Sequence, residues 1–253
     1  MSGIEELERQ FIRAGDRRAV FASAYLVTTQ TVAEWIQAGH FRSKDVALRY
    51  VVAFSNAWRD ALEEEEHHGR PPEAWRMAFA TAHLPESTVI ENLMLGINAH
   101  INHDLAFSAL KAGLDTRCDC CAFDHSCIND ALRAAAPRVR RRVSHLHAPA
   151  GSLAGALMGA GIDRHTMRSF MVARHHAWIS AKALQAAPTQ AARAAVAQAV
   201  SRRAARAAQL IQQHPRLLYP CLDALADAGG VTVPSPDDDE VFSSHRCAAH
   251  RNA

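Results

Sequence analysis

Apolar residues recur three and four positions apart along most of this 253-residue chain, which is the spacing of one face of an α-helix. Val20, Ala24 and Val27 show this spacing in the segment 16–39. Ala, Leu, Arg and Gln are abundant, and the alternating runs typical of strands are nearly absent. The sequence therefore predicts an all-α protein, and the short connections favour a single bundle of about eight to ten helices.

Glycine and proline mark the ends of the expected helices, with Asp16 and Ser43 as N-cap candidates and Gly39 and Gly113 as stops. We expect helices over residues 16–39, 43–68, 71–79, 85–113, 124–147, 163–184, 188–214 and 215–229. These helices form one domain over residues 1–229. Residues 230–253, with two prolines and an acidic run, are expected to be an unpacked C-terminal tail.

Hydropathy and motifs exclude several classes of protein. No window approaches the roughly 18 apolar residues of a membrane span, and the first ten residues are polar where a secretory signal would be apolar. We therefore expect a soluble, cytoplasmic protein with no membrane partner. There is no GxSxG, Walker A or GxGxxG motif, so acyl-hydrolase, nucleoside-triphosphatase and dinucleotide functions have no local support.

Charge is nearly balanced overall but unevenly distributed. Residues 1–132 carry 12 basic and 19 acidic side chains, and residues 133–253 carry 16 and 7. The very basic segment 133–206 lacks the interleaved aromatic residues that stack on bases, so nucleic acid is not an expected partner. We expect the acidic half to pack against the basic half or against another subunit of a homo-oligomer. An anionic ligand held by arginines is the alternative.

The segment Glu91–Gly113 carries the most informative polar residues of the chain. His100 and Asp104 are four positions apart on one helix face, with His103 beside them, and apolar residues mark the neighbouring stripe. Buried ionisable groups need partners, and a His/Asp pair at this spacing can chelate Zn, Fe or Mn. Alternatively, Asp104 only orients His100 or accepts bonds from arginines. Gly96, one turn earlier, would let a ligand or another helix approach closely.

A second polar group follows in the sequence DHSCIND. Asp124 and His125 are expected to begin the next helix, and two antiparallel helices could bring them near His100 and Asp104. The combined set would be two histidines with one or two carboxylates, which leaves coordination positions open for water or substrate. Asp124 is equally well suited to be a simple N-cap.

The remaining histidines fall into two groups. His175 and His176 are adjacent, so they point in different directions and at most one can join a common site. Exposed or tail positions are expected for His67, His68, His145, His147, His245 and His250. The Glu64/His67 and Glu65/His68 spacings imitate the ExxH ligands of di-iron bundles, but they lie in a solvated acidic run, which argues against such a centre.

Four cysteines fall within ten residues, at Cys118, Cys120, Cys121 and Cys127. A thiolate metal site and a set of reduced loop thiols are both consistent with them. The spacing CxCC followed by a fourth cysteine differs from the paired CxxC of structural zinc and from the usual iron–sulfur patterns.

Three stretches resemble one family: GDRRAVFASAYLVTTQTVAEW (15–35), PEAWRMAF (72–79) and LGINAHINHDLA (95–106). They are similar to the helical proteins of domain of unknown function family 5995, over roughly residues 10–185, and the NAHIN-x-DL core is the most specific part. The resemblance implies a helical fold and no particular activity. His100 and Asp104 match its pattern, whereas an aromatic or amide residue is frequent at position 103, which implies that His103 is not an essential ligand. The Cys-rich connection departs from it.

The spacing LGxxxHxxxD at residues 95–104 is also similar, more weakly, to the central helix of the zinc-dependent phospholipase C and nuclease fold. In that fold such a His and Asp bind zinc. This chain lacks the N-terminal Trp ligand and an evident HxxxE pair of that fold.

Together these features predict a metal-dependent enzyme, most directly a hydrolase that activates water on an anionic or polar small-molecule substrate. A divalent ion, Zn or Fe/Mn, would be bound by His100, Asp104 and His125, with Asp124 as a further ligand. The general base would be one of Asp124, His103, His175 and His176. The alternatives are a non-haem iron oxygenase in specialised biosynthesis with the same ligands, and a non-enzymatic binding or scaffold protein whose His/Asp pair is a satisfied core network.

Overall fold

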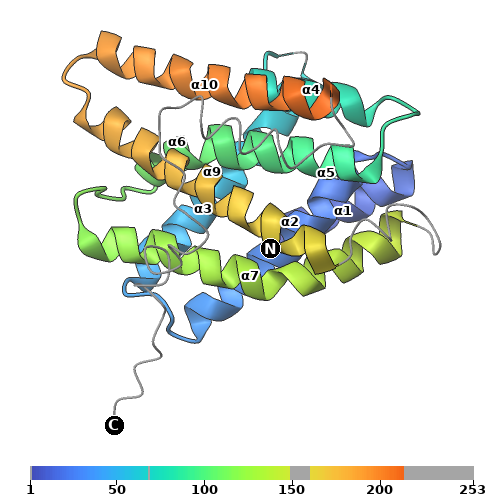
Figure 1. Cartoon of the computed structure of the whole chain (residues 1–253), viewed down its shortest axis with the longest axis horizontal. Helices are drawn as coiled ribbons and strands as arrows, with labels where there is room; N and C mark the ends of the chain where they lie inside the picture. Colours follow the sequence, from blue (N-terminus) through green and yellow to red (C-terminus); the bar gives the residue numbers. More distant parts are fainter. Residues whose placement is uncertain (1, 68, 149–159, 214–253) are drawn as a thin grey trace.

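The computed structural model describes residues 2–67, 69–148 and 160–213, and this part of the chain is all-α, as predicted. Its helices are α1 (Ser2–Ala14), α2 (Arg18–Gln37), α3 (Lys44–Glu66), α4 (Glu73–Ala82), α5 (Val89–Asn98), the π-helical segment η1 (Ala99–Asp104), α6 (Leu105–Lys111), α7 (Asp119–His147), α9 (Ala160–Ala186) and α10 (Gln190–Gln213) (Figure 1). None of the described helices combines the length and hydropathy that a bilayer crossing requires.

A continuous helix made of α5, η1 and α6 runs through the middle of the bundle (Figure 1). It begins at a capping box, in which Thr88 Oγ1 accepts from the Glu91 N–H at 3.1 Å and the Glu91 carboxylate accepts from the Thr88 N–H at 3.3 Å. It is followed by Gly113, whose φ of 76° is the left-handed conformation that favours glycine. The predicted end of the helix at Gly113 is confirmed, whereas its predicted start at Pro85 was wrong, because α5 begins at Val89.

Two apolar clusters meet at η1. The first contains Trp58, Trp75 and Leu95, and the second contains Leu105 and Trp178. Burial of each large side chain of this kind contributes roughly 2–3 kcal/mol. Helices α3, α4, α9 and α10 all contact η1, so the π-helical turn lies in the interior of the bundle.

Gly96 lies at a close approach of α5 and α2. A Cβ atom at this position would lie 2.6 Å from two ring carbons of Phe21. The Phe21 ring is itself surrounded by the rings of Trp58, Trp75 and His100, at centroid distances of 5.3–5.7 Å. The expectation that Gly96 allows a close approach of another helix is confirmed.

Helix boundaries differ from the prediction in two places. Helix α7 begins at Asp119 rather than at Asp124, so Cys120 and Cys121 lie in its first turn and not in a loop. Helix α1 was not predicted, although Ile4 and Phe11, seven positions apart, are both buried on its inner side. The predicted helix 215–229 and the predicted tail 230–253 lie outside the described residues, as do His68, His245 and His250.

Basic and acidic halves of the chain do pack together, through α7. Arg138 pairs with Glu34 of α2 at 2.8 Å, and Arg142 makes two hydrogen bonds to Glu8 of α1, at 2.5 and 2.7 Å. Glu8 is only 1% exposed and also accepts a hydrogen bond from Ser23. The intramolecular explanation of the charge asymmetry is therefore confirmed for these arginines.

Ser23 also contacts His147, whose Nε2 lies 2.9 Å from the hydroxyl oxygen. The expectation that His147 is exposed was wrong, because the end of α7 packs against α2 and buries this ring in part, which also lowers its pKa. His145 is exposed, as expected.

The substitution Glu8→Gln is expected to lower the free energy of unfolding by about 2 kcal/mol, because Ser23 and Arg142 lose a buried charged acceptor. The loss stays below that of a fully buried pair because Arg142 is 38% exposed. Urea denaturation would measure it. The matched control is Glu6→Gln on the same helix, which removes only an exposed pair with Arg9 and should cost less than about 0.5 kcal/mol. Equal losses in the two variants would contradict the structural role of Glu8.

Candidate functional site

His100 and Asp104 form a buried pair on η1, at 3% and 4% exposure. The two residues are joined by a 3.1 Å hydrogen bond between His100 Nδ1 and Asp104 Oδ2. The same carboxylate oxygen accepts the indole N–H of Trp75 from α4 at 2.8 Å, and Oδ1 lies 2.8 Å from His103 Nδ1. Both oxygens of Asp104 are therefore occupied by N–H donors.

The other ring nitrogen of His100, Nε2, is buried and has no hydrogen-bond partner among the described residues. Aromatic rings surround the imidazole: Phe54 is stacked on it at a centroid distance of 3.5 Å, and Tyr25 meets it edge-on at 4.6 Å. Phe21 and Trp75 lie at 5.7 and 6.0 Å. A neutral imidazole nitrogen without a hydrogen-bond partner has a free lone pair, which can accept a proton or bind a metal ion.

The buried environment determines the protonation states of His100 and Asp104. Burial lowers the pKa of His100 below its ordinary value of 6.5, and Asp104 offsets this only in part. Burial acts in the opposite direction on Asp104, but hydrogen bonds from His100 and His103 outweigh it and hold the pKa of this carboxyl below its usual value. At neutral pH the pair is a carboxylate and a neutral imidazole, with the proton on Nδ1 and the lone pair on Nε2.

The two asparagines of the same segment fix η1 to its neighbour. Asn98 donates to the Ala204 carbonyl of α10 at 2.9 Å, and Asn102 donates to the Asn98 side chain at 2.9 Å. The polar residues of the sequence NAHINHD thus hold the π-helical turn in place and set the direction of His100.

His125 occupies a comparable setting on α7. Its Nδ1 lies 3.0 Å from the Tyr50 hydroxyl, its ring stacks on Trp178 at 4.7 Å, and its buried Nε2 has no partner among the described residues. Burial, together with the nearby charge of Arg174, lowers its pKa well below 6.5. Tyr50 contacts His125 and Phe54 contacts His100, so the two histidines pack against adjacent turns of α3.

Asp124 does not join them as a ligand. Its two carboxylate oxygens accept the backbone N–H groups of Arg42 and Ser43, at 2.7 and 3.1 Å, and so fix the segment that leads into α3. Nor does Asp124 cap its own helix, because α7 has already begun at Asp119. The N-cap interpretation was therefore wrong, and the partners that Asp124 does have lie more than 80 positions away in the sequence.

A three-ligand metal cluster at these residues was predicted and is not present in this conformation. Among the described residues, the group of three or more His, Cys, Asp or Glu side chains with all ligand atoms within 4.8 Å of one another is Cys118, Cys120 and Cys121. The structure joins His100 to Asp104 and His103, and it places His125 and Asp124 in separate contacts.

Helix α9 contributes Arg174, His175 and His176. As expected, the two histidines point in different directions: His175 is exposed and His176 is 8% exposed, with a buried Nε2 that has no partner among the described residues. Burial lowers the pKa of both. Arg174, which belongs to the same RHHAW segment, is 2% exposed and donates to the His125 carbonyl and to Asn129.

Several site residues were missed because their role depends on the packing of distant helices. These are Tyr25, Tyr50, Phe54 and Trp75. The stretches that carry the family resemblance gave a signal for some of them: Tyr25 belongs to the first, Trp75 to the second and His100 with Asp104 to the third. The structure brings the three stretches together around one imidazole ring.

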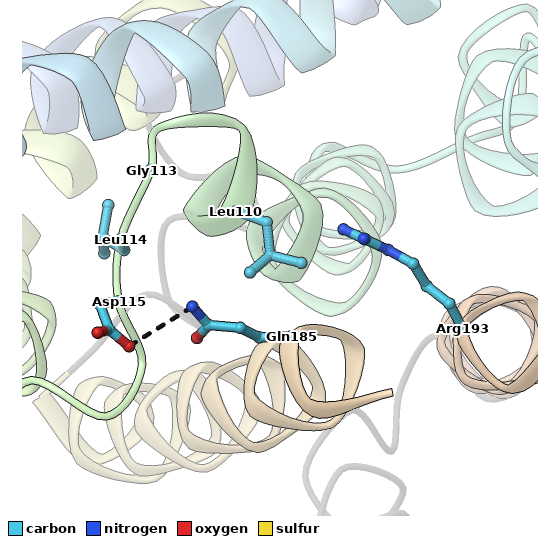
Figure 2. Close-up of a pocket in the computed structure, with 6 residues that line it drawn as sticks. All are labelled: Leu110, Gly113, Leu114, Asp115, Gln185 and Arg193. Atoms are coloured by element: carbon cyan, nitrogen blue, oxygen red, sulfur yellow. Dashed lines mark hydrogen bonds between the residues drawn. The ribbon is translucent and has the colours of Figure 1, made fainter. Parts of the chain in front are cut away.

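A pocket of about 330 Å³ lies elsewhere, between the end of α6, the end of α9 and the start of α10 (Figure 2). Its lining residues are Leu110, Gly113, Leu114, Asp115, Gln185 and Arg193. None of the predicted site residues lines it, so His100 is not reached through this pocket.

Comparisons with known proteins give one match. The model of a family of unknown function, DUF5995, matches residues 1–214 and so extends beyond the stretches that carry the resemblance. No curated protein and no solved structure matches the chain, and the weaker similarity to the zinc-dependent phospholipase C fold stays a prediction. On the strength of a match that spans the whole described bundle, the chain belongs to the family of unknown function DUF5995.

Proposed function

We propose that this protein is a hydrolytic enzyme in which His100 Nε2 accepts the proton of an attacking water molecule. The observation that carries the proposal is the asymmetry of this imidazole: Nδ1 is held by Asp104, while Nε2 is buried without a partner among the described residues. A neutral imidazole oriented by a carboxylate is the usual form of a histidine general base. The π-helical turn supports the assignment, because such turns are frequent at functional sites.

Arg174 supports an anionic substrate. This guanidinium is buried, and its hydrogen bonds go to a backbone carbonyl and an amide oxygen, not to a carboxylate, in the described part of the chain. Burial without a counter-ion is costly and lowers the pKa of Arg174. An anionic group of the substrate would supply the missing charge.

A divalent metal is a second form of the same proposal, and His125 favours it. Like His100, His125 has a hydrogen-bond partner at Nδ1 and a buried Nε2 with no partner among the described residues. Metal-binding histidines have the same arrangement, since a hydrogen bond at one ring nitrogen orients the other toward the metal. The ligands would then be His100 and His125 through Nε2, with Asp104 behind His100 and not on the metal. Most buried polar atoms of folded proteins have a hydrogen-bond partner, so two such nitrogens on neighbouring turns of the packing surface support a ligand-binding role.

The test is hydrolysis of p-nitrophenyl phosphate, bis(p-nitrophenyl) phosphate and p-nitrophenyl butyrate by the full chain and by two variants. His100→Gln is expected to lower kcat/KM by about 10²–10⁴-fold, the usual contribution of a general base. Asp104→Asn is expected to lower kcat with little change in KM, since it disturbs the tautomer of His100 and not a substrate contact. The control is His145→Gln at an exposed position of α7.

Absence of activity toward all three esters in the unmodified protein, or equal activity of His100→Gln, would contradict the proposal. Elemental analysis of untagged protein separates its two forms. About one equivalent of Zn, Mn or Fe that is lost in both His100→Gln and His125→Gln supports the metal form, and less than about a tenth of an equivalent supports the general base alone.

A further inference from the structure

Three sulfur atoms gather at the N-terminus of α7. The Sγ atoms of Cys118, Cys120 and Cys121 all lie within 4.8 Å of one another. Cys118 and Cys120 form a disulfide, and Cys121 is a buried free thiol. Two thiolates on one zinc ion lie about 3.8 Å apart, given a Zn–S bond of about 2.3 Å. The side chains therefore need only small rotations to place three sulfurs around one ion.

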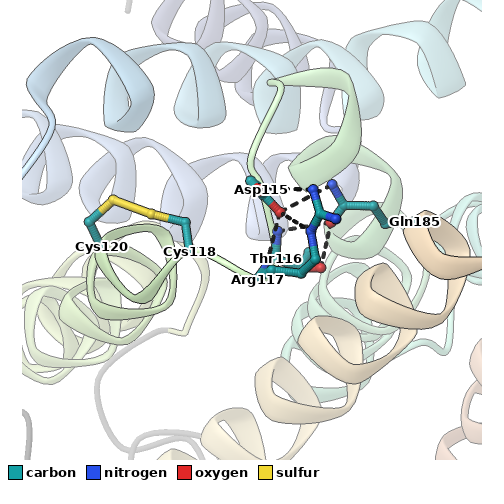
Figure 3. Close-up of polar contacts among 6 residues, drawn as sticks. All are labelled: Asp115, Thr116, Arg117, Cys118, Cys120 and Gln185. Atoms are coloured by element: carbon teal, nitrogen blue, oxygen red, sulfur yellow. Dashed lines mark hydrogen bonds and ion pairs between the residues drawn. A yellow bond between two sulfur atoms is a disulfide. The ribbon is translucent and has the colours of Figure 1, made fainter.

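The backbone that carries these sulfurs is held on both sides. Before the cluster, the Thr116 N–H and hydroxyl both donate to Gln185 Oε1 of α9 (Figure 3), and the Cys118 N–H donates to the Asp115 carbonyl at 3.0 Å. After it, the Ala122 N–H donates to the Cys118 carbonyl at 3.0 Å, the first hydrogen bond of α7. A site with fixed ligand positions loses less conformational entropy on binding.

The position of the cluster also suits sulfur in its anionic form. Cys118 is the N-cap of a 29-residue helix, its side chain makes no capping hydrogen bond, and Cys120 and Cys121 belong to the first turn. The unpaired N–H groups of a first helical turn favour negative charge close to them. Because the N-cap side chain makes no hydrogen bond to the helix, α7 does not depend on these sulfurs for its capping.

We propose that Cys118, Cys120 and Cys121 form a three-thiolate site for one thiophilic divalent cation of the zinc class, and that the Cys118–Cys120 disulfide is its closed, metal-free state. A dithiol reductant opens the site: the S–S bond takes up two electrons and two protons, and the dithiol becomes a disulfide. The metal then displaces the three thiol protons to solvent as three metal–sulfur bonds form. Water or a small exogenous ligand takes the fourth position, since the described cluster holds three protein ligands.

This site is separate from His100 and does not rest on the proposed function. A third sulfur is what distinguishes it from a simple structural disulfide, which would use only two. Cys118 and Cys121 also have the CxxC spacing, which the sequence analysis overlooked because it considered the four cysteines as one series. The site thus predicts that the redox state of the protein decides whether it holds metal.

The experiment titrates Co²⁺ into the full chain under anaerobic conditions, after reduction with a phosphine and its removal. The expected result is one equivalent of Co²⁺ with a thiolate-to-cobalt charge-transfer band, which imidazole ligands do not give, and displacement of that ion by Zn²⁺. Protein kept oxidised should show no such band. Cys121→Ser should weaken Co²⁺ binding by about 100-fold or more. The control Cys221→Ser/Cys247→Ser keeps the cluster and should bind as the unmodified protein does.

Far-UV circular dichroism shows whether each reduced variant is folded, and Cys120→Ser replaces Cys121→Ser if the latter is not. No charge-transfer band in the folded, reduced protein would overturn the proposal. An unchanged band in both Cys121→Ser and Cys120→Ser would also overturn it, because the metal would then be bound by other residues. So would a charge-transfer band in the oxidised protein.

Discussion

Acidification from about pH 7 to about pH 5.5 is expected to lower the free energy of unfolding steeply, because histidines are buried in their neutral form. Burial lowers the folded-state pKa of His100 and, further, that of His125. Below the ordinary value of 6.5 the unfolded chain takes up protons that the folded protein does not, so stability falls as the pH falls. Each such histidine contributes at most one proton to this dependence, which corresponds to about 1.4 kcal/mol per pH unit.

Carboxyl groups add a second loss at lower pH. The pKa values of Glu8 and Asp104 are lowered in the folded state, so their stabilisation is present above the ordinary values of 4.5 and 3.8 and disappears as the pH falls through the folded values. The histidine effect begins about two pH units higher, which separates the two processes in a pH series.

Urea denaturation at several pH values measures this dependence. His125→Phe should reduce the slope below about pH 6.5 by close to one proton, whatever it does to stability at neutral pH. A slope that is the same in the unmodified protein and in His125→Phe would show that His125 takes up its proton in the folded state.

Gly96→Ala is expected to destabilise the protein by about 3 kcal/mol, although alanine is the better helix former. The new methyl group would lie 2.6 Å from the Phe21 ring, and that ring cannot move freely because Trp58, Trp75 and His100 enclose it. Either α2 moves away from α5 or Phe21 presses on the imidazole. Thermal unfolding would report the loss of stability, and activity in the ester assays should fall with it.

Gly3→Ala on α1 is the matched control, since a Cβ atom there meets nothing within 4 Å. It should leave stability unchanged or raise it by up to about 1 kcal/mol, the difference in helix propensity. A Gly96→Ala variant as stable as Gly3→Ala would mean that the helices relax around the added methyl group without cost.

The helical class and the His100–Asp104 pair could be predicted because they depend on spacing within one segment. The role of Asp124 could not, since its partners are the backbone N–H groups of Arg42 and Ser43, and nothing local identifies them. The setting of His125 depends in the same way on Tyr50, whose hydroxyl lies 3.0 Å from His125 Nδ1 although the two residues are 75 positions apart. The early start of α7 was missed because its first turn contains Cys120 and Cys121, and cysteine has a low helix propensity.

Asp104 shows a different limit. The sequence identified Asp104 and its partner His100 but not the role of the carboxylate. A carboxylate four positions from a histidine can bind a metal together with it, or it can accept a hydrogen bond from the imidazole and orient the ring. In the structure Asp104 Oδ2 lies 3.1 Å from His100 Nδ1, and Trp75 donates to the same oxygen from another helix. Such a donor is visible only once α4 is packed against η1.

The π-helical turn has a consequence for the phase of the central helix. A π turn holds one residue more than an α turn, so deletion of Ile101 would let residues 89–111 close as an ordinary α-helix. The wider turn takes up this residue, so the residues after it keep the phase that they would have in an α-helix one residue shorter. If all of residues 89–111 closed as an α-helix instead, everything after the turn would rotate by about 100°. Leu105 and Ala109, both 1% exposed, would then turn out of the second cluster. The π turn is therefore what keeps the two halves of one helix in register with two different cores.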